Sequence, residues 1–303
     1  MKGALLSGKK LSDCEKWILK EGKRLIRNFY YIPINEVMVK DGIPYFHGKS
    51  LKELDFIIPR LPRVYSWIGF QILDLLREDV YFPILPESLI LSHNKFLTLV
   101  VLSEFGIPVP KTYLSLTRKT LEKILKRIGF PVVFKLLYGS LGRGVMFGDS
   151  FPSAISIMDA LERFKEPIFV EEYIPHKGED IRVFVLGERT IAEKRIAKKG
   201  ERRTNLGIGG RGVYIKNLDP EIREISLKAS KALGMQISGI DVIESEKGPV
   251  VIEANVNVHF EGLAKVSGIS IAREIVKFVR DEYKKTKIPK LKRLIKWIKS
   301  PRF

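Results

Sequence analysis

The segment GIDVIESEKGPVVIEAN, residues 239–255, predicts a β-hairpin, so the fold must contain at least one antiparallel pair of strands. Two apolar runs, 240–244 and 250–254, flank a turn at 246–248. When the strands are paired about Lys247, Asp241 falls directly opposite Glu253. Because side chains alternate along a strand, Asn255 lies on the same face as Glu253. The hairpin therefore gathers three oxygen-bearing side chains on one face of a sheet.

Two carboxylates that face each other across strands repel and destabilise the sheet. A divalent cation that prefers oxygen would relieve this repulsion at Asp241 and Glu253, with Asn255 as a neutral third ligand. Magnesium, or manganese in its place, would keep waters and take substrate phosphates as its remaining ligands. The alternative is a solvated hairpin face whose acids are unrelated. The hairpin alone leaves both interpretations open.

The first 90 residues alternate short apolar strands with helical stretches. We expect strands at 3–7, 30–33 and 56–59, helices at 12–28 and about 66–78, and a strand–loop at 82–86. The run DFIIPR at 55–60 is typical of a buried parallel strand that ends in a polar loop. These elements predict a small α/β unit built on a layered parallel sheet.

The rest of the chain continues with mixed elements. We expect helices at 92–106, with Ser92 as its cap, and at 117–129, 220–233 and 271–283, and strands at 131–136, 168–173 and 181–186. The stretch 193–211 is long, charged and rich in glycine, which is typical of a mobile active-site loop.

A lysine at the end of an apolar strand precedes a glycine-rich loop in VFKLLYGSLGRGV, residues 133–145. Such a loop suits phosphate, because glycines allow backbone N–H groups to approach oxygens and the lysine adds a positive charge. The candidate residues are Lys135, Gly139, Ser140, Gly142 and Gly144. The loop lacks the Gly-Lys-Ser/Thr of a Walker A motif, and it follows the lysine instead of preceding it as in protein kinases. A flexible hairpin is the alternative.

Further candidates for nucleotide and anion binding follow. The backbone after the strand at Glu171, Glu172, Tyr173 and Ile174 could contact an adenine edge, with Glu179 or Asp180 on the ribose hydroxyls; an ordinary sheet edge is the alternative. Lys95 on the helix at 92–106, and Arg195, Arg203 and Asn205 on the charged loop, could bind anionic groups. Taken singly, each of these is more typical of a solvated surface.

Composition excludes several classes of protein. The chain has 303 residues, a net charge of +18 and one cysteine, Cys14, which excludes a disulfide framework and a zinc site of several thiolates. It has neither an apolar run long enough to span a bilayer nor a signal peptide, so we expect no membrane span and a cytoplasmic location. Its two glutamines beside abundant Lys and Glu resemble a thermophile's composition.

Half of the excess charge lies in one tail, since nine Lys and Arg and no acid occur from Lys284 to the end of the chain. Leu291, Leu294, Ile295 and Ile298 repeat there at helical spacing. This pattern predicts an amphipathic helix, either packed on the body of the protein or docked to an anionic partner such as RNA or lipid headgroups.

The order of these motifs resembles that of an ATP-grasp ligase over nearly the whole chain. FIIPR, LSHNKFLTLVVLSEFGIPVPKT, ERRTNLGIGG and EANVNVHFEGLAKVSGISIAREIVKF are similar to the RimK-like alpha-L-glutamate ligase family, which is related to the carrier-protein ligases of lysine biosynthesis. The resemblance implies an α/β ATP-grasp fold in three parts. These are an N-terminal Rossmann-like parallel-sheet domain at 1–90, an ATP-grasp domain at 91–285 that holds nucleotide between two α+β subdomains, and a basic tail at 286–303.

The resemblance also implies roles for residues that match the family motifs. Phosphates of ATP would contact Lys95, Lys135 and the glycine loop; adenine would contact the hinge at Glu172, Tyr173 and Ile174, with Asp180 nearby. Nucleotide and substrate would contact Arg203, Thr204 and Asn205, and magnesium would bind Asp241, Glu253 and Asn255. Arg195 would stabilise the transferred phosphoryl group or the tetrahedral intermediate.

The implied reaction is ATP-dependent joining of a carboxylate to an amine through an acyl phosphate, catalysed by a homo-oligomer. Glutamate is the favoured amine, because clustered Arg and Lys suit a dicarboxylate. The acceptor could be a coenzyme, a protein C-terminus or a small acid. Val258 and His259 stand where many relatives have Pro-Gly, so the resemblance does not fix either substrate. Two alternatives are a ribosome- or RNA-associated protein without ligase activity and an ATP-grasp kinase.

Overall fold

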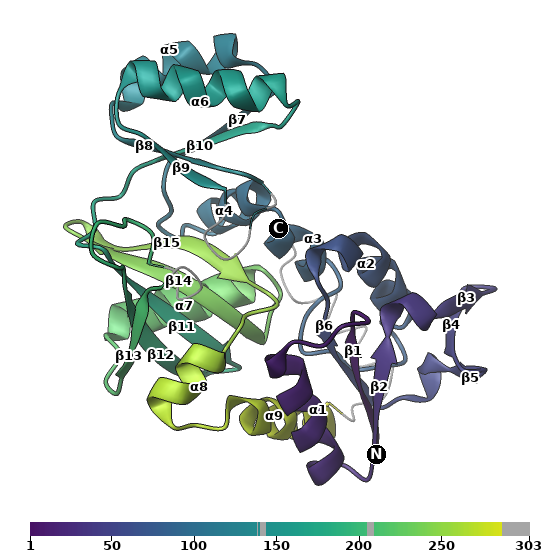
Figure 1. Ribbon diagram of the computed structural model, residues 1–303. Coiled ribbons are helices and arrows are strands. Elements are labelled where there is room, and N and C mark those ends of the chain that lie inside the picture. Colours follow the sequence, from purple (N-terminus) through teal and green to yellow (C-terminus); the bar gives the residue numbers. More distant parts are fainter. Residues whose placement is uncertain (138, 140–143, 205–208, 287–303) are drawn as a thin grey trace. The chain divides into compact units, whose positions relative to one another are not determined.

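The computed structural model describes residues 1–137, 139, 144–204 and 209–286 (Figure 1). The chain divides into two compact units, Met1–Leu89 together with the segment from Ser270 onward, and Ile90–Ile269. The helix α9 (Ile271–Lys285) thus groups with the N-terminal unit, whereas the sequence analysis assigned it to the domain at 91–285. The basic tail lies outside the described residues, apart from its first residue.

The first unit is built on a parallel sheet of order β2-β1-β6. Its strands are β1 (Lys2–Ser7), β2 (Asn28–Pro33) and β6 (Phe56–Arg60), and its helices are α1 (Asp13–Leu25), α2 (Ser66–Leu75) and α9. All five residues of β6 are buried, as the FIIPR pattern predicts. Gly3 lets the ring of Phe56 lie against the neighbouring strand, because a Cβ there would come within 2.2 Å of Phe56 Cζ.

The remaining elements of this unit are small. They are β3 (Met38–Lys40), β4 (Ile43–Phe46), β5 (Lys49–Ser50) and the 3-10 helices η1 (Ile34–Glu36), η2 (Leu51–Glu53) and η3 (Arg63–Tyr65). The β3-β4-β5 meander was not predicted, although its two turns, at Asp41-Gly42 and His47-Gly48, have the positive φ angles that such dipeptides favour. The strand–loop expected at 82–86 is a loop in the structure, and the neighbouring Tyr81 forms an isolated parallel bridge to Phe56.

The second unit contains an antiparallel sheet of order β7-β10-β8-β9, with α5 and α6 on one face (Figure 1). Its elements are β7 (Thr112–Ser115), α5 (Arg118–Ile128), β8 (Val132–Lys135), β9 (Val145–Gly148), α6 (Phe151–Arg163) and β10 (Ile168–Glu172). Leu121 and Leu125 of α5 and Met158 of α6 form a core with Phe134 of β8. This core fixes the position of Lys135, the next residue of β8.

A five-stranded antiparallel sheet of order β13-β12-β11-β14-β15 forms the other part of this unit. Its strands are β11 (Glu179–Leu186), β12 (Arg189–Ile196), β13 (Arg211–Ile215), β14 (Ile237–Ser245) and β15 (Gly248–Asn255). The helices that contact it are α4 (Lys95–Glu104), α7 (Pro220–Ala232) and α8 (Glu261–Ser267). The buried central strands β11 and β14 carry Asp180 and Asp241 of the candidate site.

The structure corrects two predictions in this unit. The helix expected at 92–106 is interrupted, because α3 (Ser88–His93) ends before Asn94, whose Oδ1 accepts a hydrogen bond from Leu97 N at 3.1 Å and caps α4. Ser92 is therefore not the cap. The loop expected at 193–211 begins later, because β12 extends to Ile196 and contains Arg195.

The predicted hairpin pairing of Asp241 with Glu253 is confirmed, but by a different register at the tip. Ser245 pairs with Gly248, so the turn is only Glu246-Lys247, and Val242 pairs with Val251. Ile252 is the extra residue of a β-bulge between these pairs. The shorter turn and the bulge compensate each other, and both Ile252 and Glu253 reach the same pocket.

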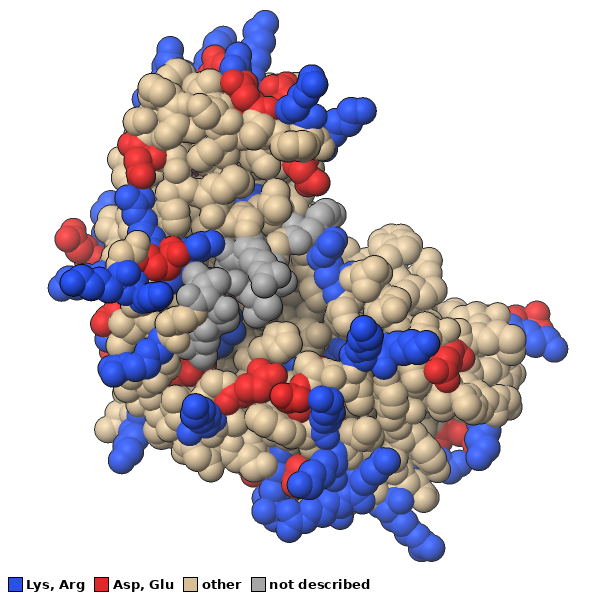
Figure 2. Space-filling view, in the orientation of Figure 1, with Lys and Arg blue, Asp and Glu red and all other residues tan. Residues whose placement is uncertain are grey.

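Charged side chains of both signs are scattered over the visible face of the molecule, with uncharged residues between them (Figure 2). Figure 2 shows lysine and arginine over α5 and α6 at the top of the view, with acidic side chains among them. Within the described ranges, no helix combines the length and the apolar composition that a membrane span requires.

Candidate active site

A pocket in the second unit is bounded by residues of both of its sheets and has about 680 Å³ of empty space, part of it open to solvent. Its lining contains both apolar and charged side chains. The apolar ones include Val133, Val145, Phe147, Ile243 and Ile252. The sequence-predicted residues on the pocket are Lys135, Glu172, Tyr173, Ile174, Asp180, Arg195, Arg203, Thr204, Asp241 and Glu253.

Aromatic side chains form part of the pocket lining. The rings of Phe147 and Tyr173 meet edge to face with centroids 6.2 Å apart, and the guanidinium of Arg202 lies 5.1 Å from the centroid of Phe147. Arg202 also pairs with Asp149 at 2.5 Å. The ring of His176 lies 5.7 Å from that of Tyr173, and burial lowers the pKa of His176. A flat aromatic ligand could stack in this part of the pocket.

Lys135 and Glu171 both line the pocket and form an ion pair there. Lys135 Nζ lies 2.6 Å from Glu171 Oε2, and both side chains come from adjacent strands, β8 and β10. Burial raises the pKa of Glu171, and the opposing charge of Lys135 only partly offsets this effect. The charge of Lys135 in the pocket is therefore balanced by Glu171. Glu171 was predicted to belong to the adenine-binding segment.

A single row of side chains crosses the five-stranded sheet. The register pairs Tyr214 with Glu193, Glu193 with Arg182, Arg182 with Asp241, and Asp241 with Glu253. Residues paired directly across antiparallel strands point to the same face. After Tyr214 the row therefore consists of a carboxylate, a guanidinium and two adjacent carboxylates. These last two are the pair predicted from the hairpin.

Two arginines neutralise Asp241, which is 1% exposed. Arg182 donates from Nε to Oδ1 and from a terminal nitrogen to Oδ2, both at 2.7 Å, and Arg195 lies 2.9 Å from Oδ2. Burial alone would raise the pKa of Asp241, but the two guanidinium groups lower it to about 2. Arg195 is itself 2% exposed and also donates from Nε to Asp180 at 2.7 Å. Its place on a buried strand corrects its assignment to a solvated loop.

Glu253 is paired with a lysine from another element. Lys95 Nζ of α4 donates to Glu253 Oε1 at 2.5 Å, and this ion pair lowers the pKa of Glu253 against the effect of burial. Asn255 pairs with Gly239 in the register, and its Nδ2 is buried and lacks a hydrogen-bond partner within the described chain. Gly239 leaves room for Val258, since a Cβ at Gly239 would lie 2.4 Å from Val258 Cγ2.

The loop after β12 brings two further predicted residues to the pocket. Arg203 and Thr204 both line it, and a terminal nitrogen of Arg203 lies 2.6 Å from Glu201 Oε2. Hydrogen bonds from the Arg203 side chain and backbone lower the pKa of Glu201 to about 2. The predicted residues Ser140, Gly142 and Asn205 lie outside the described residues. Gly139 and Gly144 are described and flank that part of the glycine loop; Gly144 has a φ of 79° and its carbonyl accepts from Leu136 N at 2.9 Å.

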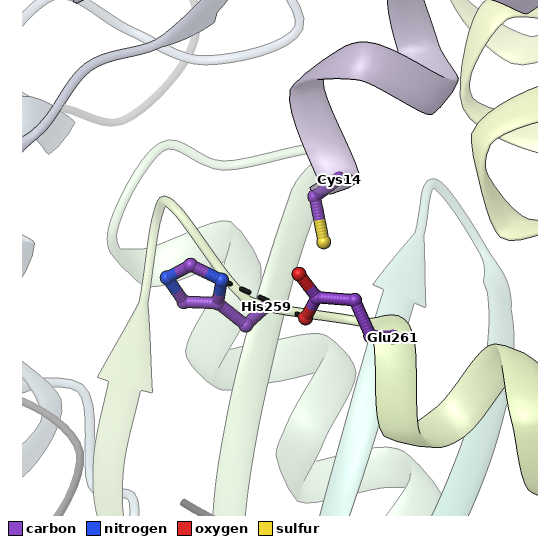
Figure 3. A group of neighbouring side chains, drawn as sticks. All are labelled: Cys14, His259 and Glu261. Carbon is purple, nitrogen blue, oxygen red and sulfur yellow. Dashed lines mark ion pairs between the residues drawn. The ribbon is translucent and has the colours of Figure 1, made fainter. Parts of the chain in front are cut away.

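Sequence reasoning missed several residues of the site, namely Phe147, His176, Arg182, Glu193 and Arg202. Alternation along 189–196 would have placed Glu193 on the same face as Arg195, had these residues been read as a strand. The departure from the family pattern at Val258 and His259 lies beside the site. His259 Nδ1 lies 3.7 Å from a carboxylate oxygen of Glu261 (Figure 3).

Comparison with known proteins agrees with this geometry. Residues 92–279 match the RimK-like ATP-grasp domain. A "Probable alpha-L-glutamate ligase" of Legionella pneumophila (strain Corby) is 35% identical over 264 residues, which cover 86% of this chain and 87% of that protein. The chain belongs to the RimK-like ATP-grasp family. It is accordingly an ATP-dependent ligase that forms carbon–nitrogen bonds.

Other relatives extend the likeness. A "Probable alpha-L-glutamate ligase" of Pseudoalteromonas translucida is 34% identical over 240 residues, covering 78% of this chain and 79% of that protein. Two solved structures share the fold. The ATP-grasp ligase PsnB, complexed with precursor peptide PsnA2 and AMPPNP, has a TM-score of 0.72 at 15% identity, covering 93% of this chain and 97% of that chain. The RimK domain protein ATP-grasp from Sphaerobacter thermophilus has a TM-score of 0.70 at 19% identity, covering 92% and 99%. The α/β ATP-grasp fold with a parallel N-terminal sheet is thus confirmed.

Proposed function

We propose that this RimK-like ligase uses ATP to join glutamate to an acidic acceptor, with the pocket of the second unit as its active site. One observation carries the proposal. The aromatic side chains of Phe147 and Tyr173 line the same pocket as the charged side chains of Lys135, Arg195 and Asp241. A nucleobase suits the aromatic side chains, and a chain of phosphates with its cation suits the charged ones.

The donor set fits a hard divalent cation. Asp241, Glu253 and Asn255 supply only oxygen ligands from adjacent strands, which is the chemistry that magnesium prefers. The unsatisfied Nδ2 of Asn255 is a hydrogen-bond donor, so it supports an acceptor near this amide, such as a phosphate oxygen of the nucleotide, since buried polar groups are normally paired. When bound, magnesium would neutralise charge on the phosphates of ATP. Manganese has the same preference for oxygen and could replace it.

The residues around the cation site have distinct roles in the proposed reaction. The acceptor carboxylate attacks the γ-phosphorus of ATP, ADP leaves, and an acyl phosphate forms. The amine of glutamate then attacks the acyl carbon, loses a proton and releases phosphate. Lys95 and Lys135 would orient the phosphates, and Arg195 and Arg203 would stabilise charge that develops during both transfers.

Positive charge on the pocket supports acidic substrates. Arg202, Arg203 and Arg195 line it together with Lys135. In this structure each is matched by a carboxylate of the protein itself, and those of Arg202 and Arg203 lie at the protein surface, at Asp149 and Glu201. Exposed ion pairs exchange partners at low energetic cost. Arg202 and Arg203 could therefore turn toward the carboxylates of glutamate and the acceptor.

The test is the substrate dependence of ADP release. Purified protein would be incubated with ATP, magnesium, single amino acids and a panel of acidic acceptors. We expect ADP release that requires both an acceptor and an amine, with glutamate the best amine. ADP release that requires the acceptor but no amine would instead identify a kinase, and no substrate-dependent release with any member of the panel would contradict the proposal.

A further inference from the structure

The row across the five-stranded sheet places one guanidinium between two carboxylates. Arg182 of β11 is the direct register partner of Glu193 on β12 and of Asp241 on β14. In this structure Arg182 donates twice to Asp241, at 2.7 Å each. Glu193 is 2% exposed, and its Oε2 is buried and accepts no hydrogen bond from the described residues. The guanidinium of Arg182 therefore donates to both oxygens of Asp241 and leaves Oε2 of Glu193 without a hydrogen bond.

A cation bound to Asp241 would change which carboxylate accepts the hydrogen bonds of Arg182. Oδ1 of Asp241 is occupied by Arg182, and Oδ2 by both Arg182 and Arg195. A metal ion needs one of these oxygens and repels both guanidinium groups. The two arginines differ in what they retain when they release Asp241.

Arg195 has a second anchor. It donates from Nε to Asp180 at 2.7 Å, and a terminal nitrogen also bonds Asp180. Arg195 can give up its single contact with Asp241 and stay bound by a carboxylate on the other side. Arg182, in contrast, donates both of these hydrogen bonds to Asp241. Once displaced, the partly buried Arg182 needs another acceptor, and Glu193 is the carboxylate directly beside it in the row.

We propose that Arg182 moves between two carboxylates, binding Asp241 when the cation site is vacant and Glu193 when a divalent cation binds Asp241. Glu193 is then a positioning residue: it receives the displaced guanidinium and so sets the affinity of the site for the cation. The inference rests on the proposed function only in taking Asp241 as a cation ligand.

The exchange satisfies both groups at once. A buried carboxylate oxygen without a hydrogen bond and a partly buried guanidinium without an acceptor each cost free energy. One bond between Arg182 and Glu193 removes both costs. Oε2 of Glu193 lies against Gly212 of β13, where a Cβ would come within 2.6 Å of it. The missing side chain at Gly212 leaves room for this carboxylate, which is 2% exposed and would turn from β13 toward β11 to meet Arg182.

The first test measures cation binding without turnover. Binding of Mn²⁺ in the presence of a non-hydrolysable ATP analogue would be measured by calorimetry and by electron paramagnetic resonance for the wild type and Glu193→Gln. Glutamine keeps the size of the side chain but accepts only a neutral hydrogen bond, so we expect about tenfold weaker Mn²⁺ binding. Glu244→Gln is the control, because it removes one negative charge from β14 at an exposed position on the opposite face from Asp241. Equal affinities of Glu193→Gln and the wild type would overturn the inference.

The second test observes the arginine directly. Crystal structures of the wild type with the analogue, with and without Mn²⁺, would show whether Arg182 bonds Glu193 in the loaded state. If the metal is bound to Asp241 and Arg182 still donates twice to that carboxylate, the inference is wrong while the proposed function stands. If the metal binds elsewhere, both the cation site and the inference fail.

Discussion

Asp241 and Glu253 lie directly opposite each other on β14 and β15, and each carboxylate is paired with a basic side chain from another element. Arg182 and Arg195 hold Asp241, and Lys95 holds Glu253. Two facing acids would otherwise destabilise the hairpin. These pairings lower the pKa of both carboxylates, of the buried Asp241 and of the partly buried Glu253, which favours the ionised form that the proposed cation site requires.

Replacement of Glu253 by glutamine should weaken the response to magnesium. Glu253→Gln keeps the shape of the side chain but removes the charge that faces Lys95 and the proposed cation. We expect the magnesium concentration that gives half-maximal ADP release to rise by at least about tenfold. Glu246→Gln, in the exposed turn of the same hairpin, is the matched control. An unchanged magnesium dependence would remove Glu253 from the cation site.

Replacement of Arg203 should slow the reaction without unfolding the protein. The Arg203 side chain is 30% exposed and pairs with Glu201 on its own loop, so Arg203→Gln should alter the melting temperature little. If Arg203 stabilises developing charge, kcat should fall by about 10²–10³-fold. Lys199→Gln, at an exposed position of the same loop, should retain kcat. Similar kcat values for both variants would show that Arg203 does not act on the reacting groups.

Stability should depend on pH through Glu193. Burial raises the pKa of Glu193 above its ordinary value of 4.5, against the attraction of Arg182 and Arg195. The native state thus favours the protonated form, so this contribution to stability is fully present below pH 4.5 and is lost as the pH rises through the raised value. Glu193→Gln cannot ionise, so its melting temperature relative to the wild type should increase between pH 4 and 7. A constant difference over that range, measured by calorimetry, would contradict a raised pKa.

The contact between Gly239 and Val258 can be tested by a double-mutant cycle. Gly239→Ala places a Cβ 2.4 Å from Val258 Cγ2 in a buried strand, so we expect a loss of about 1–3 kcal/mol in the free energy of unfolding. Val258→Ala should cost about 2 kcal/mol through the cavity that it leaves. The double variant should be more stable than the sum of the two losses predicts, because the added methyl group occupies space that valine vacates. Additive losses in urea denaturation would show that the two residues do not share this space.

The sequence predicted one end of the row of side chains across the five-stranded sheet, Asp241 and Glu253, but not the remaining members. The hairpin is local, so its symmetry brings Asp241 opposite Glu253 even though the real turn is shorter and Ile252 forms a bulge. A bulge is decided by packing on the sheet and leaves no mark in the alternation of residues. Arg182 joins the row through the pairing of β11 with β14, and a long connection separates these strands in sequence. That pairing cannot be inferred from neighbouring residues.

The strand β12, which carries Glu193 and Arg195, was not predicted because its composition is typical of a loop. The segment AEKRI contains three charged residues in succession, which is typical of a solvated loop, yet β12 buries Glu193 and Arg195 on the face that bears Asp180 and Asp241. Burial of these charges is possible only because the neighbouring strands supply opposite charges. The sequence therefore predicted Arg195 as a candidate residue and misjudged its surroundings.

The most direct measurement of the proposed chemistry follows one oxygen atom. Protein, ATP, magnesium and labelled glutamate would be incubated with acidic acceptors whose carboxyl groups carry ¹⁸O, including free glutamate and a peptide that ends in glutamate. Mass spectrometry would detect the product and the released phosphate. Ligation through an acyl phosphate predicts a glutamyl amide of the acceptor and one ¹⁸O atom in each phosphate released. Formation of ADP without amide product, or of phosphate without ¹⁸O, would contradict the account.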